Sequence, residues 1–408
     1  MFVQVSIPRE TAGAGHSLLL CADASADAPE LQGFAGQAQC VYMDPPFMTG
    51  GSFVRRRRFG TAGWRTGRPA PEYPGYEDQF PSREAYLAMV EGLIRQAHRL
   101  LKDTGVFCLH LDWRVSAYAR ILCDEIFGAD MFLNEVVWAY ESGGRARRYF
   151  SRKHDVILLY GRSKKYRFDL RKVPLERSEH RRNHMRRAVD EEGRAYRSIK
   201  SAGREYRYYD DEPVYPGDVW TDISHLQQKD PERTGFATQK PLKLLERLLK
   251  PLVEPGDLVC DLCCGSGTTL AAAQGLGCRV LGVDVSPEAL MMTRSRLDTT
   301  DMTVLCPCEN DDAMLEGIFD KQSGLLLLTG FHATHPAFPQ TERAMDVLES
   351  WSAGRLAPQE MRVDCSFGRS VGQPELPLFC ILPEGDSPAC VSTVDAAGRR
   401  RTYVWKEM

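Results

Sequence analysis

A turn that contains two glycines, placed between an apolar run and a helical pattern, constrains the fold of this chain most strongly. The apolar run 258–260 leads into glycines at positions 265 and 267, and a helical pattern follows over 268–276. Glycines let a backbone approach a ligand closely, and the first N–H groups of a helix attract an anion. Asp284 ends the next apolar run, where a carboxylate suits hydrogen bonds to ribose hydroxyls. Because a third glycine and a phosphate-binding lysine are absent, the pattern favours a nucleoside with a carboxylate end over NAD or ATP; the alternative is a tight turn without a ligand.

A rigid acidic string follows another apolar run, near the start of the chain. Asp44, Pro45, Pro46 and Phe47 come directly after the run 40–43. Two prolines hold the backbone extended and have no N–H to donate, so the string presents carbonyl acceptors beside a carboxylate. Together with an aromatic face, this set can accept two hydrogen bonds from an exocyclic amine and stack on the ring that carries it. The alternative is a rigid turn at the exit of a strand.

Strand and helix patterns alternate through most of the chain. Apolar runs predict strands, and apolar residues at helical spacing predict helices between them, including one that begins after Ser82. This alternation predicts an α/β fold with a mostly parallel, doubly wound Rossmann-like sheet. We also expect a long loop over 48–80, a helix capped by Thr238, and a helical stretch around 342–351 in a tail of unassigned fold.

Composition excludes several classes of protein. The 408 residues are 43% hydrophobic and 26% charged, which is ordinary for a globular chain, and the longest aliphatic run, 325–328, cannot span a membrane. The start lacks a secretory pattern, and the thirteen cysteines include many inside apolar runs, which favours a reducing, cytoplasmic location. The close pairs at 260/263 and 306/308 lack a second pair at zinc spacing, so no metal site is expected.

Charge is distributed unevenly, although the net value is only −3. Residues 162–207 contain 16 Lys and Arg against 7 Asp and Glu, whereas residues 298–408 contain 9 against 17. The middle segment can therefore meet a polyanion, and the acidic tail is expected to lie away from it. Consecutive arginines also follow the proline string, and their alternative interpretation is a solvated charge run: Arg55, Arg56, Arg57 and Arg58.

The motifs and their order resemble the S-adenosylmethionine-dependent amino-group DNA methyltransferases of the permuted (beta) class. The resemblance covers roughly residues 15–300 and rests on the segments 18–23, 44–47, 101–112, 126–138, 154–160, 238–241 and 261–284. Leu262 and Cys263 stand where such proteins usually carry proline and phenylalanine, and Phe47 stands where tyrosine is commoner. The resemblance implies a catalytic half over 15–160, a basic target-recognition insertion over 161–235, a cofactor-binding half over 236–298, and an accessory region over 299–408.

The same resemblance implies roles for individual residues. The Asp44 carboxylate and the Pro45 carbonyl would accept hydrogen bonds from the target amine, in a catalytic string that includes Pro46, while Phe47 would stack on a base flipped out of the duplex. Residues expected to bind S-adenosyl-L-methionine are Asp23, Lys240, Asp261, Gly265, Ser266, Gly267, Thr268 and Asp284. Residues expected to contact DNA are the four arginines 55–58 together with Arg181, Arg182, Arg186 and Arg187.

An Asp-Pro-Pro string in this family goes more often with the N6 of adenine than with the N4 of cytosine. The expected activity is therefore site-specific methylation of adenine in double-stranded DNA. Two alternatives stay open: a cytosine-N4 methyltransferase, and an inactive DNA-binding subunit of a modification complex. A restriction endonuclease and a second copy of the chain are the candidate partners, and no membrane partner is expected.

Overall fold

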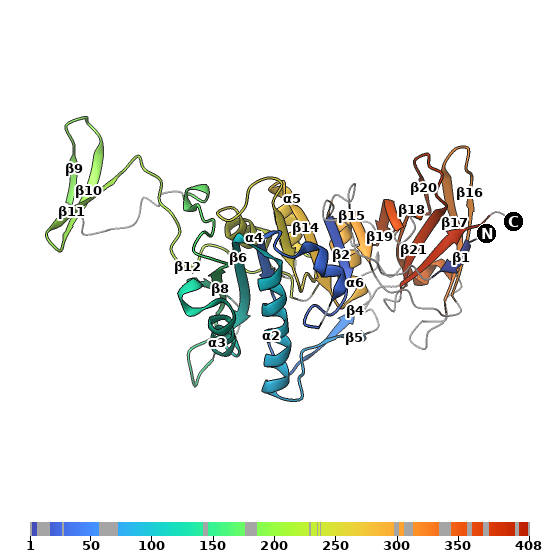
Figure 1. Cartoon of the computed structure of the whole chain (residues 1–408), viewed down its shortest axis with the longest axis horizontal. Helices are drawn as coiled ribbons and strands as arrows, with labels where there is room; N and C mark the ends of the chain where they lie inside the picture. The colour runs from blue at the N-terminus through green and yellow to red at the C-terminus, as the bar shows by residue number, and fades with distance from the viewer. Residues whose placement is uncertain are drawn as a thin grey trace.

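The computed structural model describes most of the chain (Figure 1). The described residues are 2–5, 17–26, 28–56, 72–141, 146–175, 186–227, 230–234, 236, 238–297, 302–305, 313–333, 344–356, 361–369, 375–395 and 400–406. Within these ranges, no helix has both the length and the apolar character needed to cross a membrane.

A 14-stranded mixed sheet forms the centre of the molecule. Its central strands are parallel neighbours, in the order β15 (Met302–Leu305), β2 (Ser17–Cys21), β14 (Arg279–Asp284), β13 (Leu258–Asp261), β3 (Ala38–Met43) and β6 (Leu101–Asp112). Beyond β6, the antiparallel strand β8 is followed by β7 and the short edge strand β12: His154–Gly161, Phe132–Ala139 and Val219–Trp220. The strands at the centre are buried at nearly every position, as expected for strands covered on both faces.

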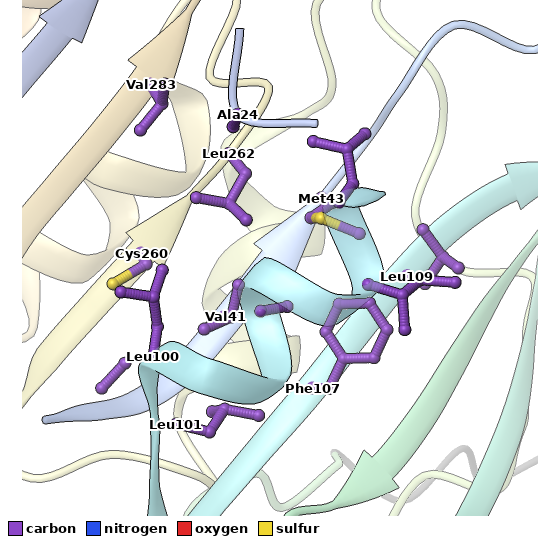
Figure 2. Close-up of a cluster of buried hydrophobic side chains, with 14 of the residues drawn as sticks. Ala24, Val41, Met43, Leu100, Leu101, Phe107, Leu109, Cys260, Leu262 and Val283 are labelled. Atoms are coloured by element: carbon purple, nitrogen blue, oxygen red, sulfur yellow. The ribbon is translucent and has the colours of Figure 1, made fainter. Parts of the chain in front are cut away.

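Helices cover both faces of this sheet. One face packs against α2 (Arg83–Leu100) and α3 (Ser116–Phe127), with Val41 and Phe107 in that core (Figure 2). The opposite face, which includes Cys40, packs against α4, α5 and α6: Leu242–Leu249, Thr268–Gly275 and Pro287–Arg296. Residues 40 and 41 belong to different cores because successive side chains of a strand point to opposite faces. The predicted doubly wound α/β fold is confirmed.

The tail extends the sheet with antiparallel strands. β15 pairs with β19 (Met361–Gly368), and the sheet continues through β18, β21, β22 and β1: Leu348–Leu356, Ala389–Asp395, Arg400–Trp405 and Phe2–Val5. A second small sheet contains β16, β17 and β20, and these strands share a core with β18: Met314–Phe319, Leu325–His332 and Phe379–Ile381. The tail is therefore a β structure built onto the edge of the central sheet.

The prediction of a helix around 342–351 is wrong. A short 3-10 helix, η4 (Ala344–Val347), is followed at once by β18. Trp351 is fully buried, and its indole N–H donates to the carbonyl of Pro377 at 2.7 Å. Packing of this strand against its neighbours thus overrides the helical spacing of the local sequence.

Two further small sheets, besides that of β16, β17 and β20, lie outside the central one in the described part of the chain. A three-stranded antiparallel sheet, which we call the β9–β11 sheet, extends away from the body in Figure 1: β9 (Arg186–Val189), β10 (Ala195–Ser201) and β11 (Arg204–Tyr209). A strand pair, β4 (Ser52–Arg56) and β5 (Glu72–Glu77), falls inside the segment 48–80, so the prediction of a structureless loop there is wrong. The aromatic and β-branched residues of this segment, Phe53, Val54 and Tyr73, favour strands, which the long glycine-rich stretch between them obscures. Short 3-10 turns complete the elements: η1 (Pro29–Phe34), η2 (Ala129–Met131) and η3 (Leu170–Lys172).

Helix ends follow the sequence at two positions and depart from it at a third. The Ser82 hydroxyl accepts from the Ala85 N–H, as predicted for the start of α2. Gly128 ends α3 with a φ of 94°. The cap predicted at Thr238 is wrong, because α4 begins at Leu242 and the Leu242 N–H donates to the Glu232 carboxylate at 2.8 Å. A side chain ten residues upstream therefore caps this helix.

Candidate active site

Five aspartates lie at the carboxyl ends of neighbouring parallel strands. Asp284, Asp261 and Asp112 are the last residues of β14, β13 and β6. Asp23 and Asp44 follow β2 and β3 by two residues and one residue. The chain leaves β13 toward β14 but leaves β3 toward β6, so the two connections diverge between β13 and β3. In open α/β sheets, ligands bind outside the carboxyl ends of the strands at such a switch point.

The proline string and the glycine turn are neighbours in space. β3 and β13 pair in parallel with Tyr42 opposite Asp261. The Leu262 N–H also donates to the Tyr42 carbonyl at 3.4 Å. Asp44 and the turn that follows Asp261 therefore leave adjacent strands at the same edge of the sheet, although they are far apart in the sequence.

The glycine turn needs both of its glycines. Gly265 and Gly267 have φ values of 49° and 74°, a region that residues with a side chain rarely adopt. A Cβ at Gly267 would lie 2.6 Å from the side chain of Thr293, and one at Gly265 would lie 3.0 Å from the Phe236 ring. Nothing larger than glycine fits either position without displacing a neighbour.

Hydrogen bonds fix the turn to β14 and α6. The Gly265 N–H donates to one oxygen of the Asp284 carboxylate at 2.8 Å, and the Ser286 N–H donates to the other at 2.8 Å. The Thr293 hydroxyl donates to the Gly265 carbonyl at 3.1 Å. Asp284 is thus oriented by two backbone N–H groups at the end of its strand.

Arg296 supports the turn from α6. Its guanidinium donates to the Ser266 carbonyl at 2.8 Å and to the Thr268 hydroxyl at 3.1 Å, and both of these residues are buried. Burial lowers the pKa of Arg296 below its usual value. No motif in the sequence distinguishes Thr293 or Arg296 from the other polar residues of this helical segment.

Asp261 lies beneath the turn. Its side chain is buried, and one carboxylate oxygen accepts from the Cys263 N–H at 3.0 Å. Burial raises the pKa of Asp261 to about 7, and the negative charges of Asp44 and Asp284 contribute to the rise. Leu262 is buried as well, and Cys263 packs against the same hydrophobic core. Leu262 and Cys263, which replace the usual proline and phenylalanine of the family pattern, are therefore packed in this chain.

Asp78 fixes the exit of the proline string. Its buried carboxylate accepts from the Met48 N–H at 2.8 Å and from the Thr49 N–H at 2.9 Å. Met48 has a φ of 55°, which costs energy for a residue with a side chain and persists only where surrounding contacts impose it. The two hydrogen bonds impose it here and fix the backbone directly after Phe47.

Lys240 contacts the catalytic string. Its ammonium nitrogen lies 2.5 Å from Oδ2 of Asp44 and 5.1 Å from the centre of the Phe47 ring. The two side chains of the ion pair are only 12% and 15% exposed. The resemblance predicts Lys240 as a cofactor-binding residue, whereas in this structure its charged group is engaged by Asp44.

A hydrogen-bonded chain of buried side chains lies behind Phe47. The Phe47 ring stacks on His110, with 6.3 Å between centroids and 29° between planes. His110 is fully buried and contacts the Tyr42 hydroxyl through Nδ1 at 2.8 Å and the Asp155 carboxylate through Nε2 at 3.2 Å. The Tyr140 hydroxyl donates to the other oxygen of Asp155 at 3.0 Å.

The surroundings displace the pKa values of two members of this chain of side chains, Asp155 and Tyr42. Burial alone would raise the pKa of Asp155, but hydrogen bonding to His110 and the positive charge of Lys240 hold it below its usual value. Burial raises the pKa of the Tyr42 hydroxyl well above its usual value. His110 and Asp155 are polar residues inside apolar strands, and this is the sequence signal that could have identified them.

The remaining predicted site residues are distributed over several places. Asp23 is exposed, and its carboxylate accepts from the N–H and the hydroxyl of Ser25 at 2.9 and 2.6 Å. Arg55 and Arg56 belong to β4, whereas Arg57, Arg58, Arg181 and Arg182 lie outside the described residues. Within the described ranges, no group of three or more His, Cys, Asp or Glu side chains is arranged to hold a metal ion.

Arg186 and Arg187 lie on opposite faces of the β9–β11 sheet, because they are adjacent in β9. Register places Arg187, Arg197 and Tyr208 in one row, and Arg186, Ser198 and Arg207 in a row on the other face. The two predicted arginines therefore cannot meet one surface of a ligand together.

Comparison with known proteins identifies the family. Residues 38–295 match the description of a DNA methylase family that covers N6 and N4 enzymes. The type II methyltransferase M.HpaI of Haemophilus parainfluenzae is 26% identical over 216 residues, which are 52% of this chain and 60% of that protein. The DNA adenine methyltransferase YhdJ of Escherichia coli (strain K12) is 27% identical over 208 residues, which are 50% of this chain and 65% of that protein.

Solved structures also resemble the fold. The protein TTHA0409 from Thermus thermophilus, solved in complex with S-adenosyl-L-methionine, is 19% identical with a TM-score of 0.43, and the match covers 71% of this chain and 100% of that one. This chain spans less than two thirds of the length of the two curated relatives named above. The family match nevertheless extends over more than half of the chain and includes both the proline string and the glycine turn, so the chain belongs to this family of DNA methylases.

Proposed function

We propose that this chain transfers a methyl group from S-adenosyl-L-methionine to the exocyclic N6 of adenine in double-stranded DNA. The observation that carries the proposal is the pairing of β3 with β13, which puts Asp44 and the turn of Gly265 at adjacent strand ends. One motif suits an exocyclic amine and the other suits a nucleoside with a carboxylate end. A methyl transfer between two ligands needs both of them at one place.

The residues present fit the proposed cofactor. The carboxylate of Asp284 is oriented by two backbone N–H groups at the end of β14, the position where the pattern suits hydrogen bonds to ribose hydroxyls. Gly265 and Gly267 carry no side chains of their own, so a ligand could approach the backbone of the turn closely, and α5 begins at Thr268 without a side-chain cap, which suits an anion near its N-terminus. When bound there, S-adenosyl-L-methionine supplies a methyl group activated by its sulfonium sulfur.

The proline string would orient the target amine. The Asp44 carboxylate and the Pro45 carbonyl would accept hydrogen bonds from its two N–H groups, which directs the nitrogen lone pair toward the methyl group. The N–C bond would form as the S–C bond breaks, S-adenosylhomocysteine would leave, and the proton lost from the methylated nitrogen would pass to the solvent. Phe47, backed by the His110 ring, stacks on the base. No covalent intermediate with the protein is needed, so the contribution of these residues is positioning and preorganised acceptors.

The β9–β11 sheet and the arginines after Phe47 would hold DNA. Basic side chains give phosphate contacts whose strength depends on salt. One face of the sheet carries Arg187 and Arg197. The exposed side chains of Tyr206, Tyr208 and Ile199 lie on the same face. This combination of basic and exposed apolar side chains favours binding to a nucleic acid. Arg55 to Arg58, Arg181, Arg182 and Arg186 remain candidates for phosphate contacts on the same proposal.

The order of motifs supports the permuted class and its division of the chain. The proline string precedes the glycine turn, and 161–235 separates them. On this proposal, 15–160 and 236–298 are the catalytic and cofactor-binding halves, 161–235 recognises the target sequence, and 299–408 is accessory. A partner endonuclease and a homodimer belong to the same proposal.

Methyl transfer to DNA tests the function and the target base together. The purified chain is incubated with isotopically labelled S-adenosyl-L-methionine and genomic DNA, and the nucleosides are separated by mass spectrometry. Label in N6-methyladenine supports the proposal, whereas label in N4-methylcytosine replaces it with the second activity of the family. The variant Asp44→Ala should lose transfer by at least about a thousandfold and still bind the cofactor. Cofactor and DNA binding without any transfer by the unaltered chain would favour the inactive DNA-binding subunit.

A further inference from the structure

Lys240 forms an ion pair with the residue that the proposed function assigns to the target amine. Its ammonium contacts Asp44 at 2.5 Å and lies 5.1 Å from the ring of Phe47. One cation therefore contacts both side chains expected to hold the base. We propose that Lys240 is a positioning residue for the Asp44 carboxylate and not a ligand of the cofactor. This inference rests on the proposed function, because it assigns a role within the same site.

The backbone around Lys240 is fixed from both sides. Gln239 is buried; its side-chain oxygen accepts from the Thr234 N–H and hydroxyl at 2.8 Å each, and its NH₂ donates to the Glu232 carbonyl at 2.8 Å. On the other side, the Glu232 carboxylate caps α4 at Leu242. Lys240 thus leaves a backbone anchored directly before and shortly after it, and its side chain is only 12% exposed, so surrounding atoms limit the positions open to its ammonium.

The negative charges around Lys240 explain why Asp44 requires a positively charged partner. Asp44 and Asp284 lie close enough to Asp261 that their negative charges help to raise its pKa. The positive charge of Lys240 also lowers the pKa of Asp155, so the ammonium acts on the carboxylates of both the proline string and the His110 chain. A carboxylate that is only 15% exposed and lies among other acidic groups would be poorly stabilised without a counter-charge, and Lys240 supplies that counter-charge.

The contact also decides which oxygen of Asp44 is left for the substrate. Lys240 occupies Oδ2, so Oδ1 is the oxygen presented to an amine. A charge-assisted hydrogen bond of this kind fixes the orientation of the carboxylate as well as its position. Misplacement of a positioned catalytic group by about 1 Å can reduce a rate about a hundredfold, so loss of the contact should appear in the chemical step.

The first test separates a positioning role from cofactor binding. Lys240→Met and Lys240→Arg are compared with Lys243→Met, a matched change at an exposed lysine of α4. With DNA and cofactor saturating, Lys240→Met should lower the single-turnover rate of methyl transfer about 10- to 100-fold, while the Kd for S-adenosyl-L-methionine changes less than about threefold. Lys240→Arg should recover much of the rate, and Lys243→Met should leave both quantities unchanged. A Kd raised more than about tenfold with the rate preserved at saturation would overturn the proposal.

A second test does not depend on methyl transfer. The ammonium of Lys240 is observed by NMR in protein labelled with ¹⁵N-lysine, with Lys240→Met used to assign the signal, in the unaltered chain and in Asp44→Asn. Engagement by Asp44 predicts a clear shift of this one signal, and an unchanged signal overturns the inference even if the chain methylates DNA. If the signal shifts but the chain transfers no methyl group to DNA, the ion pair stands and the proposed function fails.

Discussion

Ion pairs at the candidate active site and in the β9–β11 sheet both join a basic side chain to an aspartate, but in different surroundings. In the pair between Lys240 and Asp44 the side chains are 12% and 15% exposed. In the pair between Arg187 and Asp210 they are 71% and 28% exposed. Exposed pairs contribute about 0–1 kcal/mol, whereas removal of one partner from a buried pair costs about 3–5 kcal/mol.

This difference separates charges that hold a geometry from charges that can exchange partners. The carboxylates of Asp284, Asp44 and Asp155 are held by backbone N–H groups, by Lys240 and by His110, respectively. The arginines of the β9–β11 sheet pair with neighbouring acids at the surface, where a phosphate can replace a carboxylate at small cost. The predictions below test this division, beginning with the largest effect.

Removal of His110 should have the largest effect on stability. His110→Ala leaves the buried carboxylate of Asp155 and the hydroxyl of Tyr42 without their shared partner and removes the ring behind Phe47. The free energy of unfolding, measured with urea, should fall by about 3–5 kcal/mol. Arg187→Ala serves as the surface counterpart and should change it by less than about 0.5 kcal/mol. Equal losses of unfolding free energy in the two variants would contradict the division between buried charges that hold a geometry and surface charges that can exchange partners.

Asp261 should give the protein a characteristic pH dependence. Its pKa is raised to about 7 by burial and by nearby carboxylates, against roughly 3.9 in an unfolded chain. The folded state therefore holds an extra proton between about pH 4 and pH 7, and this group's contribution to stability falls as pH rises through that window and is constant above it. The slope is at most about 1.4 kcal/mol per pH unit.

The variant Asp261→Asn isolates this contribution, since its amide oxygen can still accept from Cys263 and it does not titrate. Urea unfolding of both proteins at pH 5, 6, 7 and 8 should show the variant gaining about 1–3 kcal/mol relative to the unaltered chain as pH rises. If the difference in stability between the two proteins does not vary with pH, Asp261 is ionised throughout this range. That result would contradict the raised pKa of this residue.

The smallest expected effect concerns the two faces of the β9–β11 sheet. Arg187→Ala, on the face with Tyr206 and Tyr208, should weaken DNA binding by about 1 kcal/mol and reduce the slope of log K against log salt by about one. Arg186→Ala, on the other face, is the matched control and should have a smaller effect. DNA-binding titrations between 50 and 200 mM salt measure both, and a larger loss for Arg186→Ala would assign DNA to the opposite face.

Parts of the molecule could be predicted from sequence because they depend on local backbone requirements. The glycines at 265 and 267 occupy left-handed positions, and the residues of β3 and β13 are apolar at successive positions because both faces are covered. Contacts between distant segments could not be predicted in the same way. Nothing near Lys240 indicates that it pairs with Asp44, and the Glu232 carboxylate replaced the local cap predicted at Thr238.

The fold of the tail also depends on contacts between distant segments, which local sequence patterns do not predict. β18 pairs with β19 and β21, and buried polar residues such as Ser352 and Ser392 interrupt the apolar alternation that would have identified these strands. Their burial is stabilised by partners contributed from far along the chain, so a short window of sequence contains little of the information that determines this fold.

The pairing of β1 with β22 decides how the tail can be studied. Phe2 to Val5 align with Trp405 to Thr402, and β15 covers β2 at the boundary with the tail. A chain shortened to residue 298 would leave β1 without β22, the strand it pairs with in the described part of the sheet, and would open the side of β2 to pairing with other molecules. A DNA-binding defect in such a chain could result from self-association as well as from a lost contact with DNA. Substitutions on the exposed surface of the tail therefore test its contribution to DNA binding more directly than truncation does.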